Sequence, residues 1–529
     1  MNKLQMEKKL LKGTMILTAT SFIVKLLSAI YRVPFQNLVG DEGFYVYQQV
    51  YPIYGIAMTL ALSGMPIYLS KLLASETLPG EKLDVLKQFF WYLSVFSISL
   101  FALLFFGAKQ VAMLMGDVQL TPLIQVVSIV FLFVPFLSTT RGYFQGELNM
   151  IPTATSQLVE QGIRVTVILF GGYLFTTKSL TVYQVGSMAT SGAIIGGFCA
   201  SFVLLYYVRK QISFSQVLTR PKLTQPDLLK RMIIEGGTLC LFSAYLVVFQ
   251  LIDSFTVKKY LVYQGMPDLA AKIAKGVFDR GQPLVQLGLV VAVSMTATFM
   301  PTLTHYFSNR EKSAYYQTVT SYIRVSLTIA LAAGVGLSLL MPFINTTLFS
   351  DNQGSLTLSL FVLSVTLVSM IQTYQTIYQS QNRVKYQLLA ALFGLLLKMV
   401  LTPVLTFYFG TVGSSFSTLL SLVGCLIILH HFLNRGKEKL QVGRVFLLKL
   451  TGSILVMVFG ILLYRVGVSY VLRTDTHRLL SLMITLLGVV IGFILYLLCL
   501  IKCKIFNEDE WNMLPFGHKI INKFYKKEG

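Results

Sequence analysis

The sequence contains few charged residues for its length, and this scarcity excludes most soluble folds. Asp, Glu, Lys and Arg make up 12% of the 529 residues, whereas hydrophobic residues make up 54%. A soluble globular domain usually carries about 25% charged residues. So few charges cannot cover one large apolar core. The composition therefore predicts an all-α protein that crosses a membrane many times.

Cysteine and histidine are also scarce, and neither forms a recognisable site. The five cysteines lie in or beside apolar runs without the spacing of metal ligands, which predicts small core residues and no disulfide framework. None of the five histidines pairs with a nucleophile or a metal-ligand set, and no Walker loop is present. We therefore predict no catalytic residues, no metal, no cofactor and no enzyme activity.

Long apolar runs separated by charged or Gly/Pro-rich segments predict about fourteen spans. Each is about 20 to 28 residues long, enough to cross a ~30 Å hydrocarbon core. The predicted spans are 13–36, 48–71, 87–108, 120–142, 152–176, 183–208, 230–257, 281–306, 319–343, 356–380, 386–408, 411–433, 447–469 and 478–501.

The net charge of +22 is explained by the membrane and not by nucleic acid. With both termini in the cytoplasm, the inner segments contain 29 Lys and Arg and the outer loops contain 10, as the positive-inside rule requires. Two outer loops, 258–280 and 465–478, are basic exceptions, and the first is long enough to form a surface helix.

A weak internal repeat with an offset of six spans divides the chain. Leu11-Lys12-Gly13 opens the first span and Leu229-Lys230 opens the seventh, and polar Gln/Asn segments close the fourth and tenth. The predicted organisation is an N-lobe at 1–208, a cytoplasmic linker at 209–229, a C-lobe at 230–433, and two further helices with a basic tail at 434–529. Repeated six-helix lobes are a common transporter design, with the substrate site between them.

Ionisable residues within the predicted spans are the most informative feature, because a bilayer makes them costly. Lys25 and Arg32 lie about two turns apart on one face of the first span. The others are Glu160, Arg164, Asp253, Arg280, Arg324 and Lys398.

Several of these residues also have purely structural interpretations. Glu160 and Arg164 are spaced to form an i,i+4 ion pair. Arg32 and Arg324 lie near span ends and could snorkel to the interface. Lys25 and Lys398 lie near mid-span and are harder to explain in this way.

Among the ionisable residues that lie deepest in the predicted spans, cations outnumber anions. This excess of positive charge favours an anionic substrate. Arginine forks match phosphate oxygens and lysine acts as a point charge. An exporter of lipophilic cations would need an excess of negatively charged residues instead.

Several motifs resemble the SpoVB-like branch of the polysaccharide transporter family, within the MOP exporter superfamily that includes MurJ. The segment RGYFQGELNMIPTATSQLVEQGIRV at 141–165 carries the most specific resemblance. Leu11–Thr14, Arg32–Pro34 with Gly40–Gly43, and Gly64–Pro66 with Ser70-Lys71 are similar to the family as well.

The resemblance implies a V of two six-helix lobes, two C-terminal helices beside a lipid-facing groove, and flipping of undecaprenyl-pyrophosphate-linked sugars such as lipid II. The family's functional cations correspond to Lys25, Arg32 and Arg280, and its acidic residue after the first span corresponds to Asp41 or Glu42. The arginine expected in the second span is absent near Gly55.

The chain also departs from relatives that bind sodium between spans 7 and 11. Asp253 remains, but span 11 supplies Lys398 in place of a carboxylate, so a tethered ammonium could replace the ion. This disfavours sodium and leaves the membrane potential or protons as drivers.

The favoured hypothesis is a flippase of the bacterial cytoplasmic membrane that moves a lipid-linked cell-wall precursor by alternating access. Lys25, Arg32, Arg164 and Arg280 would bind the pyrophosphate, and Asp41 or Glu42, Glu160, Asp253 and Lys398 would support or switch the site. Such a protein is expected to be monomeric and to work near wall-synthesis enzymes. The alternatives are a MATE-type drug/cation antiporter and a non-transporting scaffold.

Overall fold

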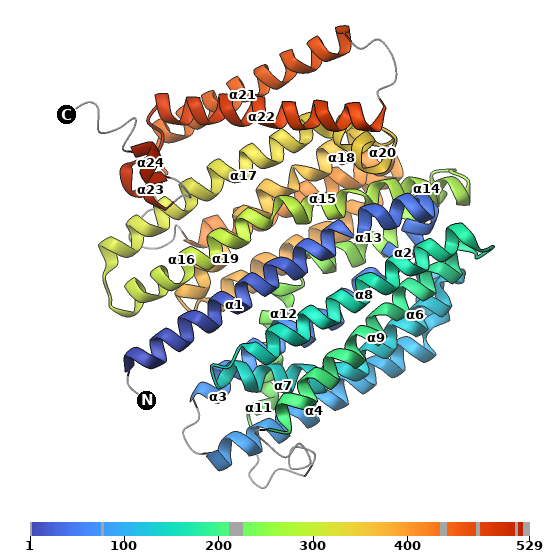
Figure 1. Cartoon of the computed structure of the whole chain (residues 1–529), viewed down its shortest axis with the longest axis vertical. Coiled ribbons are helices and arrows are strands. Elements are labelled where there is room, and N and C mark those ends of the chain that lie inside the picture. The colour runs from blue at the N-terminus through green and yellow to red at the C-terminus, as the bar shows by residue number, and fades with distance from the viewer. Residues whose placement is uncertain are drawn as a thin grey trace. The chain divides into compact units, whose positions relative to one another are not determined.

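The computed structural model describes residues 3–75, 79–210, 219, 226–433, 442–471, 477–513 and 517–521. All regular structure in these residues is helical, and they contain no strand (Figure 1). Within the described residues, ten helices are long and apolar enough to cross a membrane, or up to eleven when the bent pair Leu228–Ser243 and Tyr245–Tyr263 is one span. The fold class predicted from composition is confirmed.

The predicted number of fourteen spans is compatible with this smaller count, partly because two long segments contain a sharp break, which allows up to thirteen spans. Ala19–Ala74 turns at Gly40 (φ 69°) and Val384–Leu433 turns at Gly410 (φ 60°). Glycine adopts positive φ without steric cost, so each break can join two spans without a loop. The breaks fall where the predicted spans 1 and 2, and 11 and 12, meet.

The chain packs into two compact units. Unit 1 comprises Met1–Pro283 and Lys398–Ser414, and unit 2 comprises Leu284–Leu397 and Ser415–Gly529. The two units are defined by how the helices pack, whereas the lobes were predicted from the sequence repeat. The lobe boundaries therefore stay a prediction.

The helices of unit 1 come mostly from the first half of the chain. They are α1 (Lys3–Ile30), α2 (Arg32–Leu62), α3 (Gly64–Ser75), α4 (Pro79–Phe106), α5 (Ala108–Leu114), α6 (Thr121–Ser128), α7 (Val134–Gly146), α8 (Ile151–Thr177), α9 (Val182–Val208), α11 (Leu228–Arg231), α12 (Gly237–Ser243), α13 (Tyr245–Tyr263) and α14 (Asp268–Asp279). Short 3-10 turns at Val118–Leu120 and Ile129–Phe133 flank α6, and a π turn at Met232–Gly236 precedes α12.

Small residues let α8 and α9 pack closely, side by side along their length (Figure 1). A Cβ atom at Gly196 would lie 2.7 Å from the Glu160 carbonyl oxygen, and one at Gly192 would lie 3.0 Å from the Arg164 carbonyl oxygen. Glycine at such positions is typical of membrane helix pairs, which pack by close backbone approach. The glycines of α9 therefore position the polar residues of α8.

The helices of unit 2 are longer on average. They are α16 (Val290–Ser308), α17 (Lys312–Phe349), α18 (Ser355–Val362), α19 (Ser364–Ser380), α21 (Arg444–Val471), α22 (Arg478–Lys502), α23 (Glu508–Asn512) and α24 (Gly517–Ile520). α15 (Gly281–Gly288) and α20 (Val384–Leu433) belong partly to each unit.

α17 is the central helix of unit 2, packing against α19, α21 and α22. Pro342 lies inside α17 and cannot donate to the Ser338 carbonyl, and Ser359 Oγ donates to that oxygen over 3.0 Å instead. Tyr496 of α22 donates its hydroxyl to the Thr328 carbonyl of α17 over 2.8 Å. These polar contacts fix α17 against its neighbours.

Candidate substrate-binding site

Arg280, which directly follows α14, forms a buried two-pronged ion pair with Asp41 of α2. Nε of Arg280 donates to Asp41 Oδ1 over 2.8 Å, and Nη2 donates to Oδ2 over 2.6 Å. Gln36 Nε2 also donates to Oδ1. Paired forks of this kind are among the strongest charge-assisted hydrogen bonds. Glu42, the other acidic candidate, is half-buried and forms no ion pair within the described residues.

A glycine on α14 allows this contact. A Cβ atom at Gly276 would lie only 2.1 Å from the Asp41 carbonyl oxygen. Any side chain at position 276 would therefore push α14 away from α2 and separate Arg280 from Asp41.

Arg32 and Arg164 lie together in a buried cluster of tyrosines. The Arg32 Cζ atom lies 4.2 Å from the ring centre of Tyr51, and the Arg164 Cζ atom lies 4.3 Å from that of Tyr54. Arg164 Nη2 also donates to the Tyr31 hydroxyl over 3.0 Å. Aromatic faces attract guanidinium ions and partly replace their hydration. Sequence analysis missed the tyrosines, because their spacing along one helix is also that of ordinary core residues.

Neither of these two arginines forms an ion pair within the described part of the chain, and both are buried. No nitrogen of Arg32 has a hydrogen bond of good geometry there, and Nε of Arg164 also lacks one. Burying an unpaired charge costs several kcal/mol. The pair thus creates a region of net positive charge that an anion would stabilise.

Glu160 pairs with Arg141 and not with Arg164, so the predicted i,i+4 pair is wrong. Arg141 Nη2 lies 2.7 Å from Glu160 Oε2, and its other nitrogens donate to Ser156 Oγ and the Ala61 carbonyl. Arg141 lies in α7, near the end of a predicted span, so its sequence position indicated an interfacial residue. Only the packing of α7 against α8 buries it completely.

Asp253 of α13 and Lys398 of α20 form the ion pair that the sequence suggested. Lys398 Nζ lies 2.6 Å from Asp253 Oδ1, and both side chains are at most 2% exposed. The two residues are 145 positions apart along the chain, yet both belong to unit 1.

A second buried pair, Lys275 with Asp279, lies within α14. Their side chains are 1% and 2% exposed, and Lys275 Nζ donates to Asp279 Oδ1. The sequence placed Lys275 in an outer loop and so gave no reason to expect burial. α14 presents Lys275 and Asp279 on its buried face, together with Ala271 and Phe278.

Lys25 differs from the other predicted cations because its side chain is exposed on α1. Its neighbours Phe22 and Ile23 are exposed as well. Lys25 forms no ion pair with any residue that the structure describes. Among the four cations predicted to bind substrate, Lys25 is thus directly accessible, whereas Arg32, Arg164 and Arg280 are buried.

Asp117 is the centre of a polar cluster that ties α14 to the first half of the chain. It accepts hydrogen bonds from the hydroxyls of Tyr45 (3.3 Å) and Tyr183 (2.7 Å), and Lys272 Nζ lies 3.6 Å away. Lys272 also pairs with Asp268 at the start of α14.

Lys258 strengthens the same cluster. Its ammonium bonds the Gly116 carbonyl and the Asp268 carboxylate. Burial alone would raise the pKa of Asp268, but Lys258 and Lys272 outweigh that effect and hold it below its usual value. Except for Tyr183, the first residue of predicted span 6, these residues lie in segments that the predicted topology places outside, so their association is consistent with the predicted alternation of spans.

No group of three or more His, Cys, Asp or Glu side chains that could hold a metal occurs in the described residues. The site is therefore a set of buried cations, carboxylates and tyrosines. It can bind and orient charge.

Residues 10–307 match the profile of the family described as polysaccharide biosynthesis protein. The chain belongs to this family. The protein called "uncharacterized membrane protein YabM" of Bacillus subtilis (strain 168) is 34% identical over 518 residues, which cover 98% of this chain and 96% of the relative. As a member of this family with many apolar helices, the chain is a multi-pass membrane protein.

Two further relatives of the family, from the same organism, have more specific names. Lipid II flippase MurJ is 24% identical over 525 residues, covering 93% of this chain and 95% of the relative. Stage V sporulation protein B is 31% identical over 201 residues, covering 37% and 38%. The family resemblance inferred from the 141–165 motif is confirmed.

Solved structures show the same fold at low sequence identity. A structure of lipid II flippase MurJ in an inward closed conformation matches with a TM-score of 0.70 and 16% identity, covering 92% of this chain and 98% of that one. An inward-facing MATE transporter of the MOP superfamily matches with a TM-score of 0.60 and 13% identity, covering 77% and 92%. The chain therefore has the fold of the MOP superfamily.

Proposed function

We propose that this protein is a flippase that moves an undecaprenyl-pyrophosphate-linked cell-wall precursor, lipid II or a related intermediate, from the inner to the outer leaflet. It would act in the bacterial cytoplasmic membrane with both termini in the cytoplasm. Transport needs no covalent chemistry, because the polar head group crosses while the polyprenyl chain stays in lipid. The relationship to MurJ and to the sporulation protein supports this substrate class.

The observation that carries the proposal is the pair of buried arginines without a carboxylate partner. Arg32 and Arg164 are held by tyrosine faces, and Lys25 is exposed on the helix that leads to Arg32. A pyrophosphate carries enough negative charge to satisfy several such cations. Arg280 would join them once its bond to Asp41 opens.

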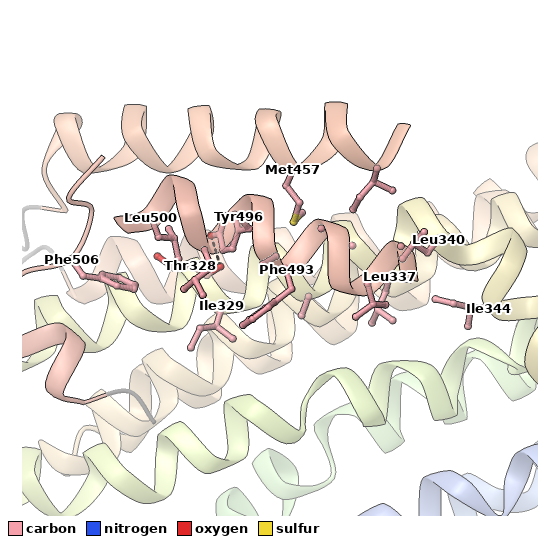
Figure 2. Close-up of a pocket in the computed structure, with 18 of the residues that line it drawn as sticks. Thr328, Ile329, Leu337, Leu340, Ile344, Met457, Phe493, Tyr496, Leu500 and Phe506 are labelled. Atoms are coloured by element: carbon pink, nitrogen blue, oxygen red, sulfur yellow. Dashed lines mark hydrogen bonds between the residues drawn. The ribbon is translucent and has the colours of Figure 1, made fainter. Parts of the chain in front are cut away.

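An apolar cavity in unit 2 supports a lipid-borne substrate. A space of about 660 Å³ lies between α17 and the two C-terminal helices, lined almost entirely by aliphatic and aromatic side chains. Figure 2 shows side chains of both α17 and α22, including Ile329, Leu337, Phe493 and Leu500, around this space. Such a lining suits a hydrocarbon chain and cannot satisfy a polar head group.

The packing of unit 1 supports alternating access. The segments 226–283 and 398–414 belong to the second half of the predicted repeat, yet they pack with the first half. Under the predicted topology, these segments include span 7, the outer loop 258–280 that follows it, the first residues of span 8 and the outer half of span 11. Arg280–Asp41 and Lys272–Asp117 would hold this outer side closed, and outward opening would break both contacts.

Coupling to sodium is not part of the proposal. The Lys398 ammonium already neutralises Asp253 at 2.6 Å, so a sodium ion there would have to displace a covalently tethered cation. The membrane potential or protons are the proposed drivers.

Head-group accessibility in proteoliposomes that contain a fluorescent lipid-linked glycan tests the proposal. Lys25→Ala and Arg32→Gln should each slow flipping by on the order of tenfold or more, because each removes a charge-assisted contact to phosphate. Lys109→Ala removes an equally charged but distant exposed lysine and should not slow it. A normal rate in both Lys25→Ala and Arg32→Gln would contradict the binding site.

The MATE-like fold keeps a drug/cation antiporter as the second candidate. That function would require accessible carboxylates. The two best candidates, Glu160 and Asp253, are engaged by Arg141 and Lys398. A changed drug-resistance profile of a deletion strain, with normal precursor flipping, would favour the antiporter.

A further inference from the structure

We propose that Asp279 is a proton-binding site whose occupancy is coupled to the packing of α14 against α2. The inference deepens the proposed function, since it names the proton as a ligand of the same outer contact. Asp279 was not among the site residues predicted from the sequence.

The first observation is the incomplete bonding of a buried carboxylate. Asp279 is 1% exposed, and Lys275 bonds one of its oxygens. The other oxygen, Oδ2, is buried without a hydrogen-bond partner among the described residues. A buried carboxylate oxygen without a partner is costly, and protonation removes most of that cost.

The second observation is the set of charges that face Asp279. Lys275 lies on its own helix, Asp253 faces it from α13, and Arg32 faces it from α2. Lys398 of α20 is bound to Asp253 and also interacts with Lys275. Each carboxylate thus has one lysine partner, and the negative charge of Asp253 also acts on Asp279.

These surroundings favour a proton at Asp279. Asp279 lies outside the candidate membrane spans, because α14 is not among the helices that are long and apolar enough to cross a membrane. Burial raises the pKa of Asp279 to about 6; Lys275 and Arg32 oppose this rise and Asp253 adds to it. An aspartate exposed to water has a pKa of about 3.9.

The third observation is that Asp279 lies beside the contact that holds α14 on α2. α14 is held on α2 by the Arg280–Asp41 pair beside Asp279 and by the close approach of Gly276 to the Asp41 backbone. If α14 moves away from α2, water reaches Asp279 and its pKa falls toward the ordinary value. Packing therefore takes up a proton, and opening releases one.

The direction of the pH effect follows from linkage. Because the packed state has the higher pKa, it binds more protons between about pH 4 and pH 6, and acid favours packing. The ratio of packed to open protein should rise about fourfold from pH 7.5 to 5.5 and on the order of 100-fold at the acid limit. Above about pH 7 the site should have no effect.

Spin labels at two exposed positions of unit 1 can report this contact: Leu269 on α14, and Val118 in the 3-10 turn before α6, a helix that packs against α2. The full-length protein would be measured in lipid nanodiscs, without substrate, by pulsed electron spin resonance between pH 7.5 and 5.0. Asp279→Asn mimics the protonated group, so its packed fraction should not depend on pH. Asp509→Asn changes an exposed aspartate of unit 2 and should respond as the wild type does.

A wild-type distance distribution that does not change with pH would overturn the proposal, as would a pH response that persists in Asp279→Asn. If Asp279→Asn does not fold, Asp279→Glu keeps a titratable group and must retain a pH response. Because the measurement uses no lipid-linked substrate, its failure leaves the flippase proposal intact, and a failed flipping assay leaves the proton site intact.

Discussion

The buried ion pair between Lys398 and Asp253 offers the sharpest test of the structure. Replacing Lys398 with methionine keeps most of the side-chain volume and removes only the charge. Asp253 would then be a buried carboxylate without its cation, 2% exposed and far from water. Breaking one side of such a pair typically costs about 3–5 kcal/mol, because the remaining charge stays desolvated.

Neutralising both partners should recover most of this loss. The double variant Lys398→Met with Asp253→Asn buries no charge, and its free energy of unfolding should return to within about 1 kcal/mol of the wild type. Unfolding can be followed by circular dichroism during titration with sodium dodecyl sulfate in mixed micelles.

Two outcomes would refute this reasoning. A loss below about 1 kcal/mol in Lys398→Met would mean that the pair is not buried as the structure has it, since exposed pairs contribute so little. A double variant as unstable as the single one would mean that Lys398 stabilises the fold through contacts other than its charge. The flipping rate of a stable double variant distinguishes two roles of the Lys398–Asp253 pair. Normal transport would indicate that the pair only stabilises the fold, and lost transport would indicate that it takes part in the conformational change.

Three further predictions concern single positions. Gly276→Val should separate α14 from α2, because even a Cβ atom would lie 2.1 Å from the Asp41 carbonyl, and cross-linking across this contact should fall. Glu160→Gln should destabilise the protein by about 3 kcal/mol in the same titration, whereas Arg164→Gln should destabilise it by less, because the loss of about 1–2 kcal/mol of cation–π stabilisation is offset by removal of a buried charge that has no carboxylate partner. Replacing sodium with potassium should leave wild-type flipping unchanged but should slow it in Lys398→Asn, where Asp253 is free to hold sodium.

The two basic outer loops that weakened the topology prediction have a structural explanation. In 258–280, four of the five cations, Lys258, Lys272, Lys275 and Arg280, are paired with a carboxylate, and Lys259 lies over the ring of Tyr263. In 465–478, Arg465 and Arg478 donate to carbonyls of α17, and Arg473 lies outside the described residues. Cations that are neutralised or used as caps add little to the charge asymmetry that orients a chain.

Local pairing rules were less reliable than composition. The i,i+4 spacing of Glu160 and Arg164 predicted a pair that the fold does not form, because Arg141 reaches the carboxylate from another helix. The same rule would have found Lys275 and Asp279, but their place in an outer loop gave no indication that they are buried. Sequence spacing identifies residues that could form an ion pair. Burial decides whether an unpaired charge at those positions would be costly.

The sequence by itself determined that the chain is an all-α membrane protein of the MOP type, because the length of its apolar runs and the motifs along them are local properties. It also identified several of the buried charges, namely Arg32, Glu160, Arg164, Asp253, Arg280 and Lys398, since an ionisable residue within an apolar run is visible without any structure. Only the tertiary structure decided which charge meets which. Asp41 with Arg280 and Asp253 with Lys398 are 239 and 145 positions apart, and helix packing alone sets such contacts. Their burial then converts scattered charges into a site, because electrostatic energies depend on how far each group is removed from water.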